Sequence, residues 1–396
     1  MAFQYVTLLL IMLLLLFYSG KLLQNKCHIF TFGGYLAIVA YVLNEGLRFG
    51  RGLDYNLYAL SYENLIAGKE SNWDIGFLYI ATTLIEIGVP WQGYVILMSF
   101  VFIFSVLILL KHYQESLPYV LPLFVLISLH EVENMVRWYM GVSFIYIGVS
   151  FLLRKSKHSL FLFILLSGLA CTFHLGVAIL PIIFYLVEKI RKPIFSPIVT
   201  ILFFFGISFL FQADFMLQFV QLANMLSDVS ERFENYGNEA EYWLTGGFAG
   251  VEAYSTLPDV QELLILGCLV FLGYKSSKVS GSKYIYAYNL FVIGLLLHPI
   301  ARKIELVGRF SQPFYFFRAI VLANIICVIY KEKKLEVAPI LLTFSILVFM
   351  NMGRRYITGP FKDNPEHYLY IWNSNGKSYE SMYDSWLYDI PQSKKK

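Results

Sequence analysis

The chain has 396 residues, of which 58% are hydrophobic and only 15% are charged, with a formal net charge of +4. This composition excludes a soluble globular domain, and no nucleic-acid partner is expected. Apolar runs of about 16 to 20 residues recur along the whole length, which is what a helix needs to cross the ~30 Å hydrocarbon core of a bilayer. Because only a helical bundle satisfies the backbone of so many spans, we predict an all-α, polytopic integral membrane helical bundle, a single transmembrane domain over residues 1–396.

The first apolar run, Ala2 to Ser19, has no basic region before it and no small-residue cleavage site. It therefore predicts a helix rather than a signal peptide. Lys21 and Lys26 place the following loop on the cytoplasmic side, because lysine and arginine accumulate there. The N-terminus is then outside, the run 29–44 returns outward, and residues 46–74 form an external loop.

Residues 75–89 form a short apolar segment that carries Glu86. Lys111 and the cluster from Arg154 to His158 mark cytoplasmic loops, and working back from them leaves both ends of this segment outside. We therefore predict that it is re-entrant or lies at the membrane interface. An ordinary short span beside a misassigned neighbour is the alternative.

The remaining apolar runs predict further spans, which bring the total to about twelve crossings with both termini outside. These spans lie near 92–110, 118–134, 138–153, 159–174, 176–187, 194–211, 258–274, 284–300, 312–330 and 336–351. Residues 212–257 are polar and acidic, which predicts a large external loop. Residues 352–396 are rich in Tyr and Trp and predict an external aromatic tail.

Arginine and lysine are distributed oppositely across this topology. Nine of the eleven arginines fall in or near external segments: Arg48, Arg51, Arg137, Arg232, Arg302, Arg309, Arg318, Arg354 and Arg355. Membrane topology asks only for Lys or Arg on the cytoplasmic side, so the external arginines indicate chemistry. The planar guanidinium group suits a bidentate grip on phosphate or pyrophosphate.

The first external loop brings together Arg48, Arg51 and Asp54. The two arginines are three residues apart and can face the same way on a helical turn, while Asp54 can orient Arg51 or act as a base. A solvated loop with a salt bridge is the alternative. Asp74, at the start of the segment 75–89, is a further candidate, although acids also favour helix N-caps.

The middle of the chain adds Glu133, Arg137 and His174. Glu133 and Arg137 are four residues apart, so a structural ion pair is one interpretation. An arginine at membrane depth is costly, about 2.5–3.5 kcal/mol or more, and is functional by default. His174 ends one apolar run at the external face, where it is either a satisfied hydrogen-bonding group or a base.

The densest external basic cluster contains Arg302, Glu305 and Arg309 at helical spacing, with Arg318 within the following span. Glu305 cannot neutralise all of that charge, so a bound anion is expected. The four cysteines are isolated and have neither disulfide nor metal spacing. No metal and no cofactor are therefore expected.

These residues resemble the pattern of the EpsG family of Wzy-like bacterial polysaccharide polymerases. The resemblance covers roughly Asn44 to Phe317 and is carried by single residues: the early arginines with Asp54-Tyr55, Asp74 before Gly76-Phe77, Arg137 after Asn134, Phe173-His174, and Glu305 before Arg309-Phe310. Asp74 stands where the family often carries Glu.

The resemblance implies a GT-C-like glycosyltransferase in the bacterial inner (plasma) membrane, with its active site facing the periplasm or the cell exterior. The donor would be an undecaprenyl-pyrophosphate-linked oligosaccharide, and the acceptor the non-reducing end of a second lipid-linked repeat unit. A chain-length regulator protein and membrane lipid would be partners. Arg137, Arg302 and Arg309 would bind pyrophosphate without a metal, with Arg48, Arg51 and Arg318 assisting and Asp74, Glu133 and Glu305 orienting. Asp54 or His174 would be the base.

Three other functions remain open from the sequence. An O-antigen ligase would use the same donor and a different lipid acceptor. A lipid-linked oligosaccharide flippase or polysaccharide exporter would need charge along the whole bundle, whereas the unusual charge here is one-sided. A membrane acyltransferase with a histidine base would draw its donor from the cytoplasmic side.

Overall fold

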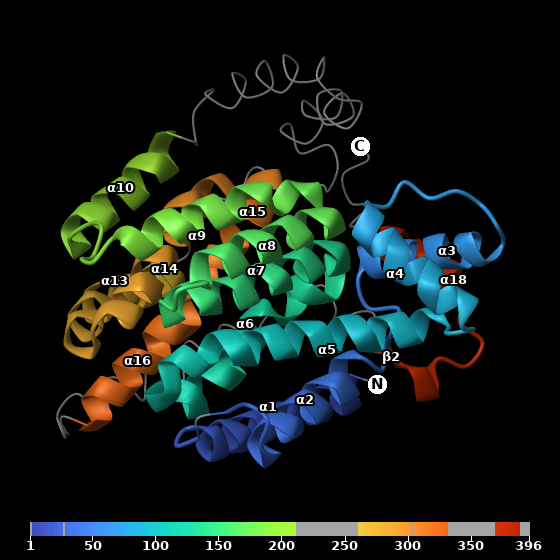
Figure 1. Cartoon of the computed structure of the whole chain (residues 1–396), viewed down its shortest axis with the longest axis horizontal. Helices are drawn as coiled ribbons and strands as arrows, with labels where there is room; N and C mark the ends of the chain where they lie inside the picture. The colour runs from blue at the N-terminus through green and yellow to red at the C-terminus, as the bar shows by residue number, and fades with distance from the viewer. Residues whose placement is uncertain (1, 27, 211–259, 302–304, 332–368, 389–396) are drawn as a thin grey trace.

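A computed structural model describes residues 2–26, 28–210, 260–301, 305–331 and 369–388 (Figure 1). The predicted external loop 212–257, the predicted span 336–351 and most of the predicted tail lie outside these residues. Within them the chain forms a helical bundle with one small strand pair.

The helices are α1 (Ala2–Leu23), α2 (Phe32–Glu45), α3 (Leu53–Ile66), α4 (Ile75–Glu86), α5 (Trp91–Leu110), α6 (Leu117–Asn134), α7 (Val136–Arg154), α8 (Ser159–Phe173), α9 (Ile179–Lys189), α10 (Pro197–Leu210), α13 (Val260–Ser280), α14 (Ser282–Ala301), α15 (Glu305–Tyr315), α16 (Arg318–Lys331) and α18 (Tyr379–Tyr388). Short 3-10 turns are η1 (Lys111–Ser116), η2 (Leu175–Ala178) and η5 (Ile371–Asn373), and the strands are β1 (Arg48–Phe49) and β2 (Leu369–Tyr370).

Six described helical segments are long and apolar enough to cross a membrane. They are Phe3–Leu23, Trp91–Asn134, Val136–Arg154, Glu262–Ser280, Ser282–Ala301 and Val307–Tyr330. The segment Trp91–Asn134 joins α5 and α6 through η1 and so covers two of the predicted spans. The all-α, multi-pass class is thus supported, while twelve crossings and a GT-C-like architecture stay predictions.

The bundle has two distinct ends, joined by its long helices. Helix α5 has 20 residues, which makes it about 30 Å long. At its first residue it packs near α3 and α4, and at its last it enters η1. Figure 1 shows α3, α4, α18 and β2 gathered at the end where α5 begins.

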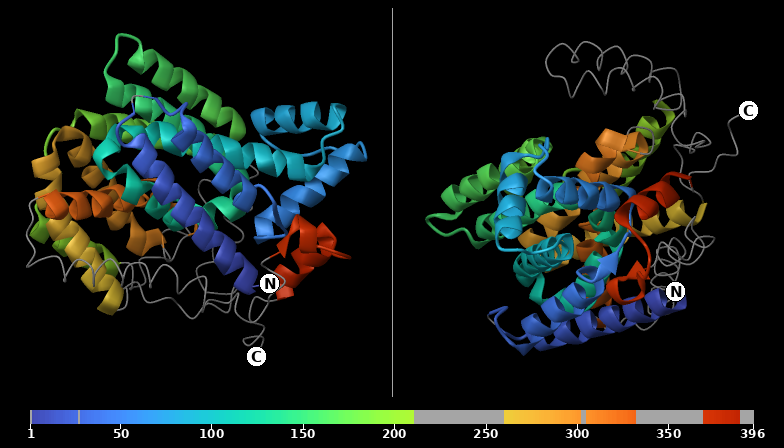
Figure 2. Two further views of the ribbon diagram at one scale, coloured as in Figure 1. Left: turned by 90° about the horizontal axis from the view of Figure 1, so that it is seen from below. Right: turned by 90° about the vertical axis from the view of Figure 1, so that its right-hand side faces the viewer.

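The two strands join predicted external segments that are far apart in the sequence. β1 and β2 pair antiparallel, with Arg48 opposite Tyr370 and Phe49 opposite Leu369. The side-chain amide of Asn373 donates to that of Gln4 in α1 at 3.1 Å, and Figure 2 shows the C-terminal segment beside the start of α1. The first external loop, the C-terminal segment and the N-terminal end of α1 therefore lie together, as the predicted topology requires.

A sharp turn after β1 makes room for this C-terminal segment. Gly50 has φ +65°, and a Cβ atom added to it would lie 2.7 Å from the end of the Met382 side chain in α18. Only glycine takes that backbone conformation without strain and leaves the space free. The chain can therefore reverse into α3 while α18 packs directly over the turn.

The short segment that was predicted to be re-entrant or interfacial forms α4, a helix of 12 residues. At 1.5 Å per residue it is about 18 Å long, too short to cross a bilayer alone. It packs on α3 and α8 and leaves Ile75 and Tyr79 more than 70% exposed. This geometry fits either prediction, and the location of α4 relative to the membrane stays a prediction.

Candidate functional site

Two arginines of the first external loop are buried with two carboxylates, in a group that we call the arginine core: Glu45, Arg48, Arg51 and Glu133. A terminal nitrogen of Arg51 lies 2.7 Å from Glu133 Oε1 and 3.5 Å from Glu45 Oε1. Arg48 donates to the backbone oxygen of Glu45 at 2.7 Å and lies 3.8 Å from Glu45 Oε2. With two positive and two negative groups, and with both arginines only 3% exposed, the core is closed and neutral when all four are ionised.

The guanidinium of Arg51 is enclosed by two aromatic rings from the two ends of the chain. Its central carbon lies 4.9 Å from the ring centre of Tyr5 and 4.7 Å from that of Tyr370. The Tyr370 hydroxyl donates to Asn44 Oδ1 at 2.6 Å. Burial raises the pKa of Tyr370 to about 12, so this hydroxyl keeps its proton for the bond to Asn44. The N-terminal helix and the C-terminal segment thus complete the walls of the core.

Glu133 contacts a different arginine from the one that its sequence spacing suggests. A continuous helix would bring Glu133 to Arg137, but α6 ends at Asn134 and α7 begins at Val136. Met135 between them has φ −88° and ψ 57°, which is not helical. The interpretation of Glu133 and Arg137 as an ion pair is therefore corrected: the bend at Met135 turns Glu133 towards Arg51.

Arg137 instead faces Asp74, in a second group that we call the open cluster: Asp54, Tyr58, Asp74, Arg137 and Arg309. A terminal nitrogen of Arg137 lies 3.1 Å from Asp74 Oδ2, and the side chains are 16% and 12% exposed. Asp74 stands at the N-cap of α4 and makes no side-chain capping hydrogen bond. Its carboxylate serves Arg137, so the N-cap interpretation does not account for it.

Tyr58 in α3 lies among the charges of the open cluster. The guanidinium carbon of Arg137 lies 5.7 Å from the centre of the Tyr58 ring. Burial raises the pKa of Tyr58, the positive charges of Arg137 and Arg309 oppose this shift, and the negative charge of Asp54 adds to it. Charged groups from α3, α7 and α15 therefore lie near enough to Tyr58 to act on it electrostatically.

Asp54 is placed by the end of α6. Its backbone N–H donates to Asn134 Oδ1 at 3.1 Å, and it occupies the first turn of α3. Gly52, with φ +95°, lies so close to Asn134 that an added Cβ would be 3.0 Å from Asn134 Oδ1. The α6–α7 junction thus positions both groups, because Glu133 enters the arginine core and Asn134 holds the turn that carries Asp54.

His174 lies between α8 and η2, against an aromatic wall. Its Nδ1 accepts a hydrogen bond from the backbone N–H of Gly176 at 3.1 Å. Its ring meets Trp138 edge-on at 5.0 Å, and Trp138 also contacts Phe310, the residue after Arg309, at 5.4 Å. Because Nδ1 is the acceptor, the neutral ring carries its hydrogen on Nε2 and donates from there.

Arg318 belongs to a third set of contacts. Its guanidinium carbon lies 4.1 Å from the centre of the Tyr315 ring, and Tyr315 stacks on His298 at 4.7 Å. His298 Nε2 lies 3.6 Å from Glu262 Oε1. Of the other predicted residues, Arg302 lies outside the described residues, and Glu305 begins α15 with a side chain that is not described.

Three residues were missed by the sequence reasoning: two members of these groups, Glu45 and Tyr58, and Tyr370, whose ring encloses Arg51. Glu45 follows the predicted span 29–44 directly, and an acid at a membrane boundary was a usable signal. Tyr58 lies four residues after Asp54, and helical spacing could have suggested it. Tyr370 offered no signal, because its role depends on a contact with a strand more than 300 residues away.

The open cluster is suited to an anion by its accessible arginine and by its aromatic surroundings. Arg137 has one carboxylate partner and is partly exposed, whereas Arg51 has two carboxylate partners and is buried. Among the described residues, no three His, Cys, Asp or Glu side chains come together in a way that could hold a metal ion. Arg137 and Arg309 are the positive groups of the open cluster.

The family model of the EpsG family matches residues 32–361 of the chain. Neither a curated protein nor a solved structure matches it. The matched range contains every residue of the arginine core and of the open cluster. Tyr5 and Tyr370, the two rings that enclose Arg51, lie outside it.

Proposed function

Because the chain belongs to the EpsG family, a family of polysaccharide polymerase or Wzy-like proteins, we propose that it joins lipid-linked oligosaccharide repeat units at the open cluster. Membership of this family supports the role of a polysaccharide polymerase in a multi-pass membrane protein. The proposed donor is an undecaprenyl-pyrophosphate-linked oligosaccharide at the outer leaflet. The proposed acceptor is the non-reducing end of a second lipid-linked unit.

The observation that carries this proposal is the partly exposed Arg137, paired with Asp74 and grouped with Arg309 and Asp54 around Tyr58. A pyrophosphate can replace or share the Asp74 contact, because guanidinium binds phosphate oxygens in bidentate geometry. Arg137 and Arg309 would stabilise the negative charge that develops on the leaving group. This is the charge neutralisation that a metal ion supplies in other transferases, and we propose that it is metal-independent here.

In the proposed step the acceptor hydroxyl attacks the anomeric carbon of the donor. The new bond is the glycosidic C–O bond, and the bond that breaks joins the anomeric carbon to the pyrophosphate oxygen. Undecaprenyl pyrophosphate leaves with the bonding electron pair, and the proton of the attacking hydroxyl passes to a base. Tyr58 supplies an aromatic surface against which a sugar ring can pack.

The geometry favours Asp54 over His174 as that base. His174 uses Nδ1 as an acceptor towards Gly176, so in the neutral ring Nε2 carries the hydrogen and acts as a donor. Asp54 is half-buried in the first turn of α3, and a carboxylate oxygen can accept the proton of an attacking hydroxyl. We assign proton acceptance to Asp54 and a hydrogen bond to a substrate oxygen to His174.

Arg48 and Arg51 take a different role in this proposal from the one expected from the sequence. Both are buried against carboxylates, so a pyrophosphate could reach them only by displacing buried ion pairs. We propose that they are positioning residues, which fix the loop between β1 and α3 and thereby the position of Asp54. Arg318 would act near the substrate only through Tyr315 and His298.

The test is an assay of purified protein with a lipid-pyrophosphate-linked repeat unit, in the presence of a chelator, with products resolved on a gel. The wild type should give a ladder of polymer, and Arg137→Ala and Arg309→Ala should abolish it. Arg191→Ala, which removes an exposed arginine that pairs with Glu188, is the matched control and should leave the ladder unchanged.

Other outcomes would replace the proposal. Transfer of a single unit onto a different lipid acceptor, without a ladder, would identify a ligase. Movement of the intact lipid-linked unit between leaflets of a liposome, without new glycosidic bonds, would identify an exporter. A ladder that survives both arginine substitutions would show that the pyrophosphate binds elsewhere.

A further inference from the structure

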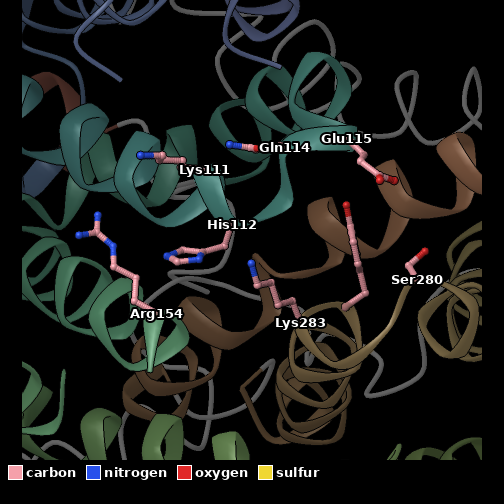
Figure 3. A pocket seen from close by; sticks show the side chains of 8 residues that line it. Lys111, His112, Gln114, Glu115, Arg154, Ser280 and Lys283 are labelled. Carbon is pink, nitrogen blue, oxygen red and sulfur yellow. The ribbon is translucent and has the colours of Figure 1, made fainter. Parts of the chain in front are cut away.

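A cavity of about 470 Å³ lies at the end of the bundle where α5 passes into α6. It is lined by Lys111, His112, Gln114, Glu115, Arg154, Ser280, Lys283 and Tyr284 (Figure 3). These residues come from η1, the last turn of α7 and the junction between α13 and α14. We call it the lysine-face cavity, because it lies among the lysine-rich loops that were predicted to be cytoplasmic.

The lysine-face cavity is remote from the open cluster. Helix α7 carries Arg137 in its first turn and Arg154 as its last residue. Its 19 residues span about 28 Å. A ligand in the cavity would therefore be separated from the open cluster by the length of a membrane-spanning helix.

Three positive side chains line this cavity. Figure 3 shows Lys111, Arg154 and Lys283 placed around His112. His112 Nε2 is held by the Ser150 hydroxyl at 2.8 Å. Burial, together with the positive charges of Lys283, Arg154 and Lys111, lowers the pKa of His112 to about 4. His112 lies in the turn η1 between α5 and α6, where the three positive side chains add to the effect of burial.

A neighbouring group on the same face shows how such charge is ordinarily compensated. The buried carboxylate of Glu188 lies 3.2 Å from Lys189, 3.3 Å from Arg191 and 3.9 Å from Lys155. Among the described residues, Lys111, Arg154 and Lys283 have no carboxylate oxygen within the 4.0 Å that defines an ion pair. Within the part of the chain that the structure describes, the positive charge of the lysine-face cavity is thus not compensated by an ion pair.

The opposite side of the cavity is polar and carries one acidic group. Glu115, Ser280 and Tyr284 line it, and Figure 3 places Glu115 and Ser280 away from Lys111 and Arg154. At about 470 Å³ the cavity is larger than a lone phosphate needs. A carboxylate beside hydroxyl groups suits a ligand that brings hydroxyl donors to that side.

We propose that the lysine-face cavity binds a phosphate ester that carries free hydroxyl groups, of the glycerol phosphate type found in anionic phospholipid headgroups. Its phosphate contacts Lys111, Arg154 and Lys283, and its hydroxyls face Glu115 and Tyr284. Basic pockets between membrane helices on the cytoplasmic side are suited to such headgroups. The inference is independent of the proposed polymerase reaction.

The experiment reconstitutes the full-length protein in nanodiscs that contain equal amounts of phosphatidylglycerol and phosphatidylcholine. The protein is released from the nanodisc in a native mass spectrometer, and the lipids that stay bound to it are counted. The wild type should retain more phosphatidylglycerol than phosphatidylcholine, and this ratio is the enrichment. In Lys111→Gln/Arg154→Gln/Lys283→Gln the enrichment should be at least tenfold lower. The charge-matched control is Lys157→Gln/Lys275→Gln/Lys278→Gln, exposed lysines of the same face that do not line the cavity, and it should keep the wild-type enrichment.

Equal enrichment in the wild type and the cavity variant, or equal loss in the control, would overturn the proposal in favour of general surface attraction. If the triple variant does not yield folded protein, Arg154→Gln alone decides, because that side chain is exposed. It should lose about half or more of the enrichment, and no loss would overturn the proposal.

Two soluble probes distinguish the source of the phosphate ester and test its orientation. In detergent, glycerol phosphate that competes with phosphatidylglycerol would show that the site accepts a free phosphate ester. Retention of the lipid in its presence would show that the acyl chains are required. Glu115→Gln should weaken the binding of glycerol phosphate at least threefold and leave the binding of inorganic phosphate unchanged. Equal effects on the binding of both would overturn the assigned orientation.

Discussion

The arginine core and the open cluster lie at the same end of the bundle and share the α6–α7 junction, yet they differ in access. In the core, Arg51 is 3% exposed and meets two carboxylates and two aromatic rings. In the open cluster, Arg137 is 16% exposed and meets one carboxylate. The comparison teaches that an arginine predicted to be external in a membrane protein can either form a buried structural ion pair or contribute to a ligand site. The number of buried counter-charges separates the two.

The largest effect is expected when the arginine core loses one partner. Arg51→Ala leaves Glu45 and Glu133 buried without their shared positive charge, and breaking such a pair costs about 3–5 kcal/mol of stability. Chemical unfolding in mixed micelles should show a loss of this size. A core that tolerates Arg51→Ala with unchanged unfolding would mean that the comparison between the two groups is wrong.

The next effect falls on activity rather than on stability. Arg137→Ala should lower the rate of polymer formation by about 10²–10³, the loss typical of removing one group that stabilises a developing charge. Its unfolding curve should stay near that of the wild type, because the side chain is partly exposed. Arg137→Lys should restore only part of the rate, since an ammonium group lacks the planar fork. If Arg137→Lys forms polymer as fast as the wild type, Arg137 does not need to bind the pyrophosphate in bidentate geometry.

A smaller effect tests whether the C-terminal segment belongs to the core. Tyr370→Phe removes the donor to Asn44 Oδ1 and leaves a buried acceptor unpaired, at a cost of about 1–3 kcal/mol. The control is Tyr330→Phe, because Tyr330 is 80% exposed and its change should be neutral. Matching unfolding curves for both variants would show that the β1–β2 contact does not stabilise the core.

The smallest effect is expected on the opposite face. Arg191→Ala removes one of three positive partners of Glu188, and an exposed ion pair contributes about 0–1 kcal/mol. Its effect on unfolding should decrease further at high salt, because exposed pairs are screened. A loss as large as that of Arg51→Ala would show that exposure does not separate the groups.

The helices of the bundle were predictable from the sequence to within a few residues. The predicted spans 92–110, 118–134 and 138–153 correspond to α5, α6 and α7, because apolar runs of this length have few alternatives in a bilayer. In the structure β1, β2 and the start of α1 meet. The side of the membrane on which the N-terminus, the first loop and the C-terminal tail lie stays a prediction.

The pairing of charges was predictable only in part. Sequence spacing joined Glu133 to Arg137, but the non-helical Met135 lies between them and redirects Glu133 to Arg51. Asp74 is separated from Arg137 by more than 60 residues, so no local pattern could reveal their contact. Side-chain partners depend on how helices pack, and a pattern within one helix does not contain that information.

The sequence by itself determined the all-α, multi-pass class and the residue types of the candidate site, because the bilayer imposes its rules on every segment separately. The sidedness of arginine and lysine stays a prediction. Only the tertiary structure decided which arginines are buried against carboxylates and which are partly exposed. That division depends on Tyr5 and Tyr370 enclosing Arg51 from opposite ends of the chain, and on the bend at Met135. Burial and counter-charge are properties of packed neighbours, and the chain brings those neighbours together only when it folds.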